Sequence, residues 1–228
     1  MQINTATLTL KTDKPVNETP TKLRGYIGSQ FKENILLHNH YDHEIYLYTY
    51  PLVQYGIIEG QPYLFGLEEG VDVITQISSK IKELQLNKTY TITEKLLHEK
   101  TYDINTTPQK YKYKIITPWL ALNTKNDHKY KQITSQRDRK IFLNNILIGN
   151  ILSMCKGLGI IINHRIKLSS YLNPVTIKYK SVLMTAFTGE FITNCNLPDY
   201  IGLGKGVSHG FGTIIRDQEY VDDNNLWY

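Results

Sequence analysis

Hydrophobic and polar residues alternate over residues 3–12, where Leu8 and Leu10 share one face and threonines occupy the other. A period of two predicts a strand with one buried face. Beyond it, after Thr19 and Pro20, apolar residues recur every three to four positions. Because threonine is a good N-cap and proline suits the first helical position, a helix is predicted to begin here.

The hydrophobic pattern predicts four further elements before the boundary between the two halves of the chain. Two apolar runs, 52–58 and 63–67, flank turn-forming residues and indicate a β-hairpin. Isoleucines at helical spacing predict a second helix over 74–84, and residues 90–97 are typical of a strand. The order β-α-β-β-α-β is that of the ferredoxin-like motif. The sequence Asn-Thr-Thr-Pro at 105–108 marks the predicted boundary.

The second half of the chain predicts a different set of elements. Residues 110–114 alternate lysine and tyrosine, which on a strand places three lysines on one face. Residues 136–156 have the most regular helical pattern, with Ser135 and Asp138 resembling a capping box. Further strands are expected at 175–180, 182–192 and 211–215. The apolar positions of the predicted helix 136–156 are Phe142, Ile146, Ile148, Leu152 and Cys155, of which Cys155 is expected to lie in the core.

The composition of the 228-residue chain is that of a globular protein, with 41% hydrophobic residues and a formal charge of +5. No run of about 20 apolar residues predicts a membrane span. The polar N-terminus has no signal-peptide pattern. Cys155 and Cys195 lack the spacing of a disulfide scaffold or a cysteine zinc site. A reducing, cytoplasmic setting is therefore expected.

The charge is concentrated in one block, because residues 106–180 hold 14 basic and 2 acidic residues while both flanking segments are net acidic. Such a block indicates a polyanionic partner such as nucleic acid, the alternative being a solvated lysine-rich surface. A phosphate at the start of the long helix would offset the unfavourable effect of cations there. For the strand lysines, a charged edge strand is an equally good interpretation. The candidate phosphate contacts are Lys110, Lys112, Arg137, Arg139 and Lys140.

Residues 202–212 form a glycine-rich segment, GLGKGVSHGFG. Its spacing fits neither a dinucleotide fingerprint nor a P-loop. It consists of two Gly-hydrophobic-Gly halves with a lysine between them. Glycines let a backbone approach phosphates, which N–H groups and a lysine can bind; the alternative is a turn packed on the sheet. The residues expected to contact phosphates are Gly202, Gly204, Lys205, Gly206, His209 and Gly210.

This segment resembles the signature loop of the CRISPR-associated endoribonucleases of the RAMP superfamily, which cut repeat RNA into guide RNAs. The segments KLRGYIG, LLHNH and YPLVQYGIIEGQPYLFGLEEG are similar to one branch of that family. The resemblance implies an α+β protein of two tandem ferredoxin-like (RRM-like) βαββαβ domains, residues 1–105 and 106–228, with a C-terminal glycine-rich loop. It implies CRISPR repeat RNA as partner and leaves open a homodimer and an association with a CRISPR effector complex.

The histidine cluster HNHYDH at 38–43 has two interpretations, of which the first is a metal site. It spells HxHxDH, the zinc motif of metallo-β-lactamase-type hydrolases. The glycine pair that usually follows this motif is absent, since Glu44 and Ile45 stand there. Zinc also needs three or four converging ligands. The zinc hydrolase is therefore the weaker alternative.

The second interpretation is metal-independent RNA cleavage without a cofactor. One group removes the 2′-OH proton and another protonates the departing 5′-oxygen, and imidazole suits both tasks. His38 and His40 lie two apart after the first helix, where the family's active-site histidine lies. The cation that stabilises the phosphorane is expected to be Lys32, the second histidine or a more distant group. Tyr46 and Tyr48 are candidate hydrogen-bond partners, with core packing as an equally good interpretation. The expected products carry a 2′,3′-cyclic phosphate and a 5′-hydroxyl; the other alternative is a relative that binds the repeat without cutting it.

Overall fold

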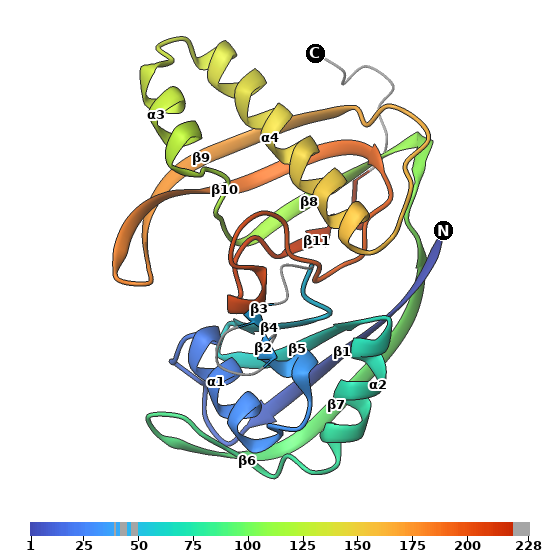
Figure 1. The fold of residues 1–228 in the computed structure, drawn as a ribbon, viewed down its shortest axis with the longest axis vertical. Coiled ribbons are helices and arrows are strands. Elements are labelled where there is room, and N and C mark those ends of the chain that lie inside the picture. Colours follow the sequence, from blue (N-terminus) through green and yellow to red (C-terminus); the bar gives the residue numbers. More distant parts are fainter. Residues whose placement is uncertain (39, 42–44, 47–49, 221–228) are drawn as a thin grey trace. The chain divides into compact units, whose positions relative to one another are not determined.

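The chain forms two compact units by its internal contacts (Figure 1). The computed structural model describes residues 1–220 except 39, 42–44 and 47–49, and at 40, 41, 45 and 46 it describes the backbone. The first unit holds residues 2–102 together with 207–210. The second holds residue 1, residues 103–206 and the residues from 211 on. After forming most of the second unit, the chain therefore contributes residues 207–210 to the first unit.

The first unit is built on a five-stranded sheet with the strand order β4-β5-β1-β7-β6. β5 pairs antiparallel with both β1 and β4, so β1 and β4 run in the same direction on either side of it. The order β4-β5-β1-β7 is that of the predicted ferredoxin-like motif. The strands are β1 (Gln2–Thr12), β4 (Val53–Ile58), β5 (Gln61–Leu67), β6 (Glu83–Gln85) and β7 (Thr89–Asp103).

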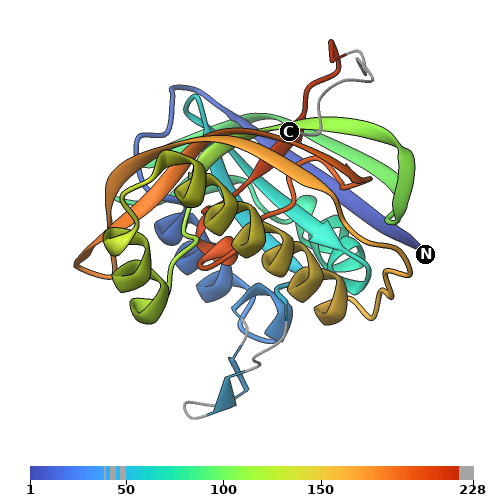
Figure 2. The same ribbon diagram turned by 90° about the horizontal axis from the view of Figure 1, so that it is seen from above.

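Two helices, α1 (Pro20–Gln30) and α2 (Glu69–Ser78), cover one face of this sheet (Figure 2). Leu8 of β1 is buried in one cluster with Leu23 of α1 and Ile74 of α2. The alternation along β1 and the helical spacing in α1 therefore supply two sides of the same core. Thr19 has the extended backbone of an N-cap without a capping side-chain hydrogen bond, and Pro20 is the first helical residue.

The second helix ends earlier than predicted, at Ser78 rather than near residue 84. Ile81 and Leu84 still lie in the core, with 4% and 0% of their surface exposed. Ile81 reaches it from the segment that leads into β6, and Leu84 reaches it from β6 itself. Helical spacing alone does not distinguish a helix that continues to residue 84 from one that ends earlier and is followed by a turn. A turn can also place an apolar residue on the core side.

Between α1 and β4 the first unit holds small elements. These are the 3-10 turn η1 (Ile35–Leu37) and a two-stranded ribbon of β2 (His40–Tyr41) and β3 (Ile45–Tyr46). In this ribbon the backbone of His40 pairs with that of Tyr46.

The second unit has a four-stranded sheet in the order β11-β8-β10-β9, with antiparallel neighbours. This is again the ferredoxin-like order, but the glycine-rich segment with the 3-10 turn η2 (Val207–His209) stands between β10 and β11 in place of a second helix. The edge-strand interpretation of residues 110–114 is wrong, because β8 lies between β11 and β10. The strands are β8 (Thr106–Trp119), β9 (Leu168–Tyr179), β10 (Val182–Cys195) and β11 (Ile214–Arg216).

The long helix of the second unit, α4 (Gln136–Gly157), follows the shorter α3 (Thr124–Gln132). Ser135 caps α4, accepting a hydrogen bond from the Asp138 N–H at 3.3 Å. Cys155 lies in the core as predicted, whereas the other apolar positions named from the sequence are half-buried or exposed. Apolar residues occur on several sides of this helix, and packing selects among them. The buried residues are Leu143, Leu147, Ile151, Met154 and Cys155. In the described part of the chain, no helix combines the length and hydrophobicity needed to cross a membrane.

Candidate active site

His38 stands directly after η1, whose end is held by hydrogen bonds. The Asn34 side chain accepts from the Leu36 N–H at 3.3 Å. The Tyr55 hydroxyl donates to the Leu37 carbonyl at 2.9 Å. Burial raises the pKa of Tyr55, so this hydroxyl stays protonated and remains a donor. The backbone that carries His38 is therefore fixed from both sides.

The imidazole of His38 is oriented by the backbone of Lys32. Its Nε2 lies 3.0 Å from the Lys32 carbonyl oxygen. Because a carbonyl can only accept, Nε2 carries the hydrogen. In the neutral ring Nδ1 is then the basic nitrogen, the atom able to take up a proton. The Lys32 side chain itself is exposed.

Arg24 of α1 connects His38 with the glycine-rich segment. One of its terminal nitrogens donates to the His38 carbonyl at 2.6 Å, and the other lies 2.8 Å from Nε2 of His209. Arginine only donates, so Nε2 of His209 accepts, and its Nδ1–H donates to Thr21 Oγ1 at 3.2 Å. These contacts require the neutral His209 ring, and they lie within the first unit because residues 207–210 belong to it.

Arg24 was not among the residues expected from the sequence. The available signal was its spacing, since Thr21, Arg24 and Gly28 lie at i, i+3 and i+7 on one face of α1. A Cβ on Gly28 would lie 3.4 Å from the His38 Cβ. This face therefore packs against His38.

The other two predicted catalytic side chains, those of His40 and Tyr46, lie outside the described residues. Only their backbones are placed, directly opposite each other in the ribbon. Positions 39, 42 and 43 of the predicted zinc motif also lie outside them. Within the residues that are described, no group of three or more His, Cys, Asp or Glu side chains could hold a metal ion.

The glycines of residues 202–212 have a packing role. Gly204 has φ +86°, and a Cβ there would lie 2.6 Å from Trp119 Nε1; at Gly210, with φ +81°, it would lie 2.6 Å from Pro20 Cγ. The N–H groups of Lys205 and Gly210 donate to carbonyls of the fold. This geometry favours the alternative of a packed turn over a loop of N–H groups open to phosphate. Gly202 is buried, Gly206 is half-buried, and the Lys205 side chain is exposed.

Of the three lysines in the predicted stripe on β8, Lys114 is exposed and Lys112 is half-buried. Lys110 is only 5% exposed. Lys112 Nζ lies 2.9 Å from Glu190 and 3.7 Å from Asp217, and Lys114 lies 3.3 Å from Asp217. The hydrogen bond that Lys112 donates to the Glu190 carboxylate raises the pKa of Lys112. Burial opposes ionisation of Asp217, but the two lysines hold the pKa of its carboxyl below the usual range. Lys112 and Lys114 therefore already have anionic partners.

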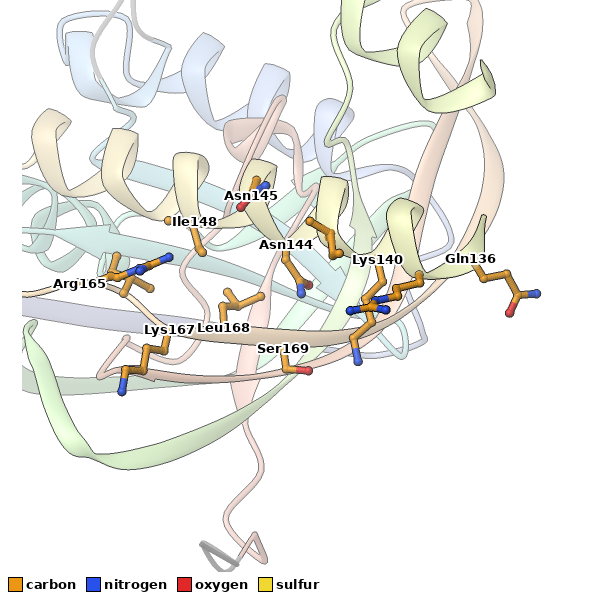
Figure 3. Close-up of a pocket in the computed structure, with 12 residues that line it drawn as sticks. Gln136, Lys140, Asn144, Asn145, Ile148, Arg165, Lys167, Leu168 and Ser169 are labelled. Atoms are coloured by element: carbon orange, nitrogen blue, oxygen red, sulfur yellow. The ribbon is translucent and has the colours of Figure 1, made fainter. Parts of the chain in front are cut away.

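The cations of α4 lie in a different setting. Arg137 and Lys140 line a groove of about 800 Å3 that also includes Arg165 and Lys167, which the sequence did not single out (Figure 3). Arg139 lies elsewhere, where its Nε donates to the Ile133 carbonyl at 2.7 Å. The structure therefore separates the predicted cations into a groove-lining pair and one bound to the backbone.

Both halves of the chain match known family models. Residues 1–103 match the Cas6b N-terminal domain and residues 105–217 the Cas6b C-terminal domain. The chain is also 39% identical over 147 residues, 63% of its length, to an uncharacterised protein of Methanocaldococcus jannaschii, of which this covers 99%.

Solved structures are similar over almost the whole chain. A crystal structure of Cas6b is 36% identical with a TM-score of 0.90, and one of the CRISPR RNA processing endoribonuclease Cas6b is 32% identical with a TM-score of 0.77. Each comparison covers 95% of this chain and 100% of the other. A Cas6 product complex, 13% identical with a TM-score of 0.55, shares the fold.

Proposed function

Since the chain belongs to the Cas6b family, we propose that it is an endoribonuclease that cleaves CRISPR repeat precursor RNA to release guide RNAs. The observation that supports the proposed cleavage chemistry is the orientation of His38. Its ring is held by the Lys32 carbonyl and its backbone by Arg24. A side chain fixed in one tautomer is suited to directed proton transfer.

The proposed reaction is attack of a ribose 2′-OH on the adjacent phosphorus. It forms the bond to the 2′-oxygen and breaks the bond to the 5′-oxygen, leaving a 2′,3′-cyclic phosphate and a 5′-hydroxyl. The reaction requires a base for the 2′-OH proton and an acid for the departing oxygen. With Nδ1 as its basic nitrogen, His38 is the proposed base, which leaves His40 as the acid. No step requires a metal or a cofactor.

The proposal also assigns roles to the neighbouring side chains. Lys32 offsets the charge that develops on the phosphorane, and Tyr46 hydrogen-bonds at the site. Arg24 acts as a positioning residue, since its donors are already directed to His38 and His209. In the second unit, cations that are exposed or half-buried hold the RNA backbone. Those retained from the sequence prediction are Arg137, Arg139, Lys140 and Lys205.

The test is cleavage of repeat RNA from the same locus in excess EDTA, by the wild type and by His38→Ala/His40→Ala. We expect the wild type to cut in EDTA. The double variant should lose about 10²- to 10⁴-fold in rate while binding the RNA with the same affinity. Cutting that depends on added zinc would contradict the metal-free mechanism. Tight binding without cutting under any condition would make the protein a non-catalytic repeat-binding subunit.

A further inference from the structure

A groove in the second unit brings together cations from two separate parts of the chain. One wall is α4, with Arg137 and Lys140, and the other is the segment entering β9, with Arg165. Figure 3 shows Lys140 and Arg165 toward opposite ends of this groove, and the Lys167 side chain directed away from α4. Positive charge is therefore placed on both sides of a central hollow.

Within the described part of the chain, Arg137, Lys140 and Arg165 differ from Lys112 and Lys114 of β8 in having no acidic partner. Across the residues that the structure describes, no carboxylate forms an ion pair with Arg137, Lys140 or Arg165. Lys112 and Lys114, in contrast, are paired with Glu190 and Asp217. Unpaired cations lining a concave surface focus the field on an incoming anion. The groove is thus the part of the basic block best prepared for phosphates.

The centre of the groove is suited to a base. Asn144 and Ile148 point from α4 toward β9, and Leu168 faces them from the strand (Figure 3). The Ser170 hydroxyl donates to Asn144 Oδ1 at 2.6 Å, which leaves the Asn144 NH2 as the hydrogen-bonding group on this side chain. Apolar walls with a placed amide are typical of sites that enclose a flat ligand.

We infer that this groove binds an unpaired nucleotide of the RNA substrate, an inference that rests on the proposed function. Arg165 and Lys140 contact the phosphates on either side of it, and the Asn144 amide donates to an acceptor on the base edge. A volume of about 800 Å3 is in the range that encloses one small ligand. A duplex presents its phosphates outward and keeps its bases stacked, so an unpaired nucleotide fits this hollow better.

An exposed aromatic residue extends the site beyond the groove. Tyr171 of β9 is 54% exposed, and Lys140 Nζ lies 4.4 Å from the centre of its ring. Gln136 and Lys140 line both the groove and a second hollow that contains Tyr171. Stacking on exposed aromatic rings is a common way of binding unpaired bases. Tyr171 therefore offers a platform for the neighbouring base.

The test is the affinity for short oligouridine, oligoadenine and oligocytosine RNAs, measured by fluorescence anisotropy. It compares the full-length protein with Arg165→Ala, Asn144→Ala and the control Lys156→Ala. Lys156 is an exposed cation of the same helix outside the groove. The Arg165 side chain is exposed, and its backbone carbonyl, which the substitution keeps, accepts from the Asn194 amide, so its variant should fold normally. Thermal melting checks this for every variant.

We expect Arg165→Ala to weaken binding of unpaired RNA about tenfold, the effect of a lost hydrogen bond to a charged group. Asn144→Ala should lower the affinity for at least one of the three base-containing RNAs several-fold. It should leave an abasic RNA of the same length unaffected. Lys156→Ala should change any of these affinities by no more than about twofold.

Three outcomes would overturn the inference. Equal losses of RNA affinity in Arg165→Ala and Lys156→Ala would mean that RNA binds to a diffuse positive surface. Equal losses for duplex and unpaired RNA in Arg165→Ala would mean a duplex occupant. An equal effect of Asn144→Ala on abasic RNA would mean that no base is bound there. Because binding is the readout, a protein that passes this test yet cuts no repeat RNA would refute the proposed function and leave the groove assignment intact.

Discussion

At the scale of single residues, Arg24 is the side chain that joins two histidines. Its planar guanidinium donates in two directions at once, to the His38 carbonyl and to the His209 ring. A lysine carries the same charge but lacks this fork of fixed donors. Replacing Arg24 by lysine therefore keeps the positive charge at this contact while removing the fixed geometry of its donors.

We expect Arg24→Lys to lower the single-turnover cleavage rate by about ten- to a hundredfold, the cost of a small displacement of a reacting group. RNA affinity should stay within about twofold, since the charge is kept. The pH profile of cleavage should change together with the rate, because the His38 environment changes. The matched control is Lys22→Ala, an exposed cation on the same helix. Wild-type cleavage by Arg24→Lys would contradict the positioning role.

The residue scale also shows which parts of the site were open to sequence reasoning. His38 and its acceptor Lys32 are six residues apart, so local pattern and placement after a helix pointed to both. Arg24 and His209 are 185 residues apart, and nothing in the chain's periodicity reports a contact of that range. The neutralisation of Lys112 by Glu190 depends equally on a pairing between distant strands.

At the scale of elements, strands were easier to predict than the faces of helices. Alternation along β1 reports burial directly, because successive side chains point to opposite sides. Along α4 apolar residues occur on several faces, and the sheet selects Leu143, Leu147 and Ile151. Leu143 and Leu147 each lie one position after an apolar residue named from the sequence, Phe142 and Ile146. That one-residue difference has a measurable energetic consequence.

We expect Leu147→Ala to lower the free energy of unfolding by about 2–5 kcal/mol, because a fully buried leucine leaves a cavity. Ile146→Ala, at a half-buried neighbouring position, should cost less than half as much. Urea denaturation followed by circular dichroism measures both. A larger loss in Ile146→Ala would mean that Ile146, and not Leu147, packs in the core.

At the scale of the whole molecule, the basic block of the sequence is divided by the fold into two classes of cation. The β8 lysines face Glu190 and Asp217, which lie far from them along the chain. Arg137, Lys140 and Arg165 line a groove and have no carboxylate partner among the residues described. Net charge in a segment thus overestimates the charge available to a polyanion. The ionic-strength dependence of binding counts only the cations that contact phosphates.

The salt dependence of RNA affinity should therefore distinguish Lys140→Ala from Lys112→Ala. We expect the slope of log Kd against log salt to fall by about 0.7 in Lys140→Ala, the contribution of one phosphate contact on a single strand. In Lys112→Ala the slope should stay as in the wild type. Filter binding over a range of potassium chloride concentrations measures both slopes. Equal changes in the two variants would mean that the Glu190 pair opens on RNA binding.

The membership of residues 207–210 in the first unit has a consequence for synthesis on the ribosome. Translation is vectorial, so residues 2–102 emerge long before His209 is made. A nascent chain can form the sheet and helices of the first unit, but Arg24 gains its imidazole acceptor only after the second unit has been translated through Gly206. The surroundings of His38 are thus completed late, by a segment that arrives once almost the entire second unit already exists.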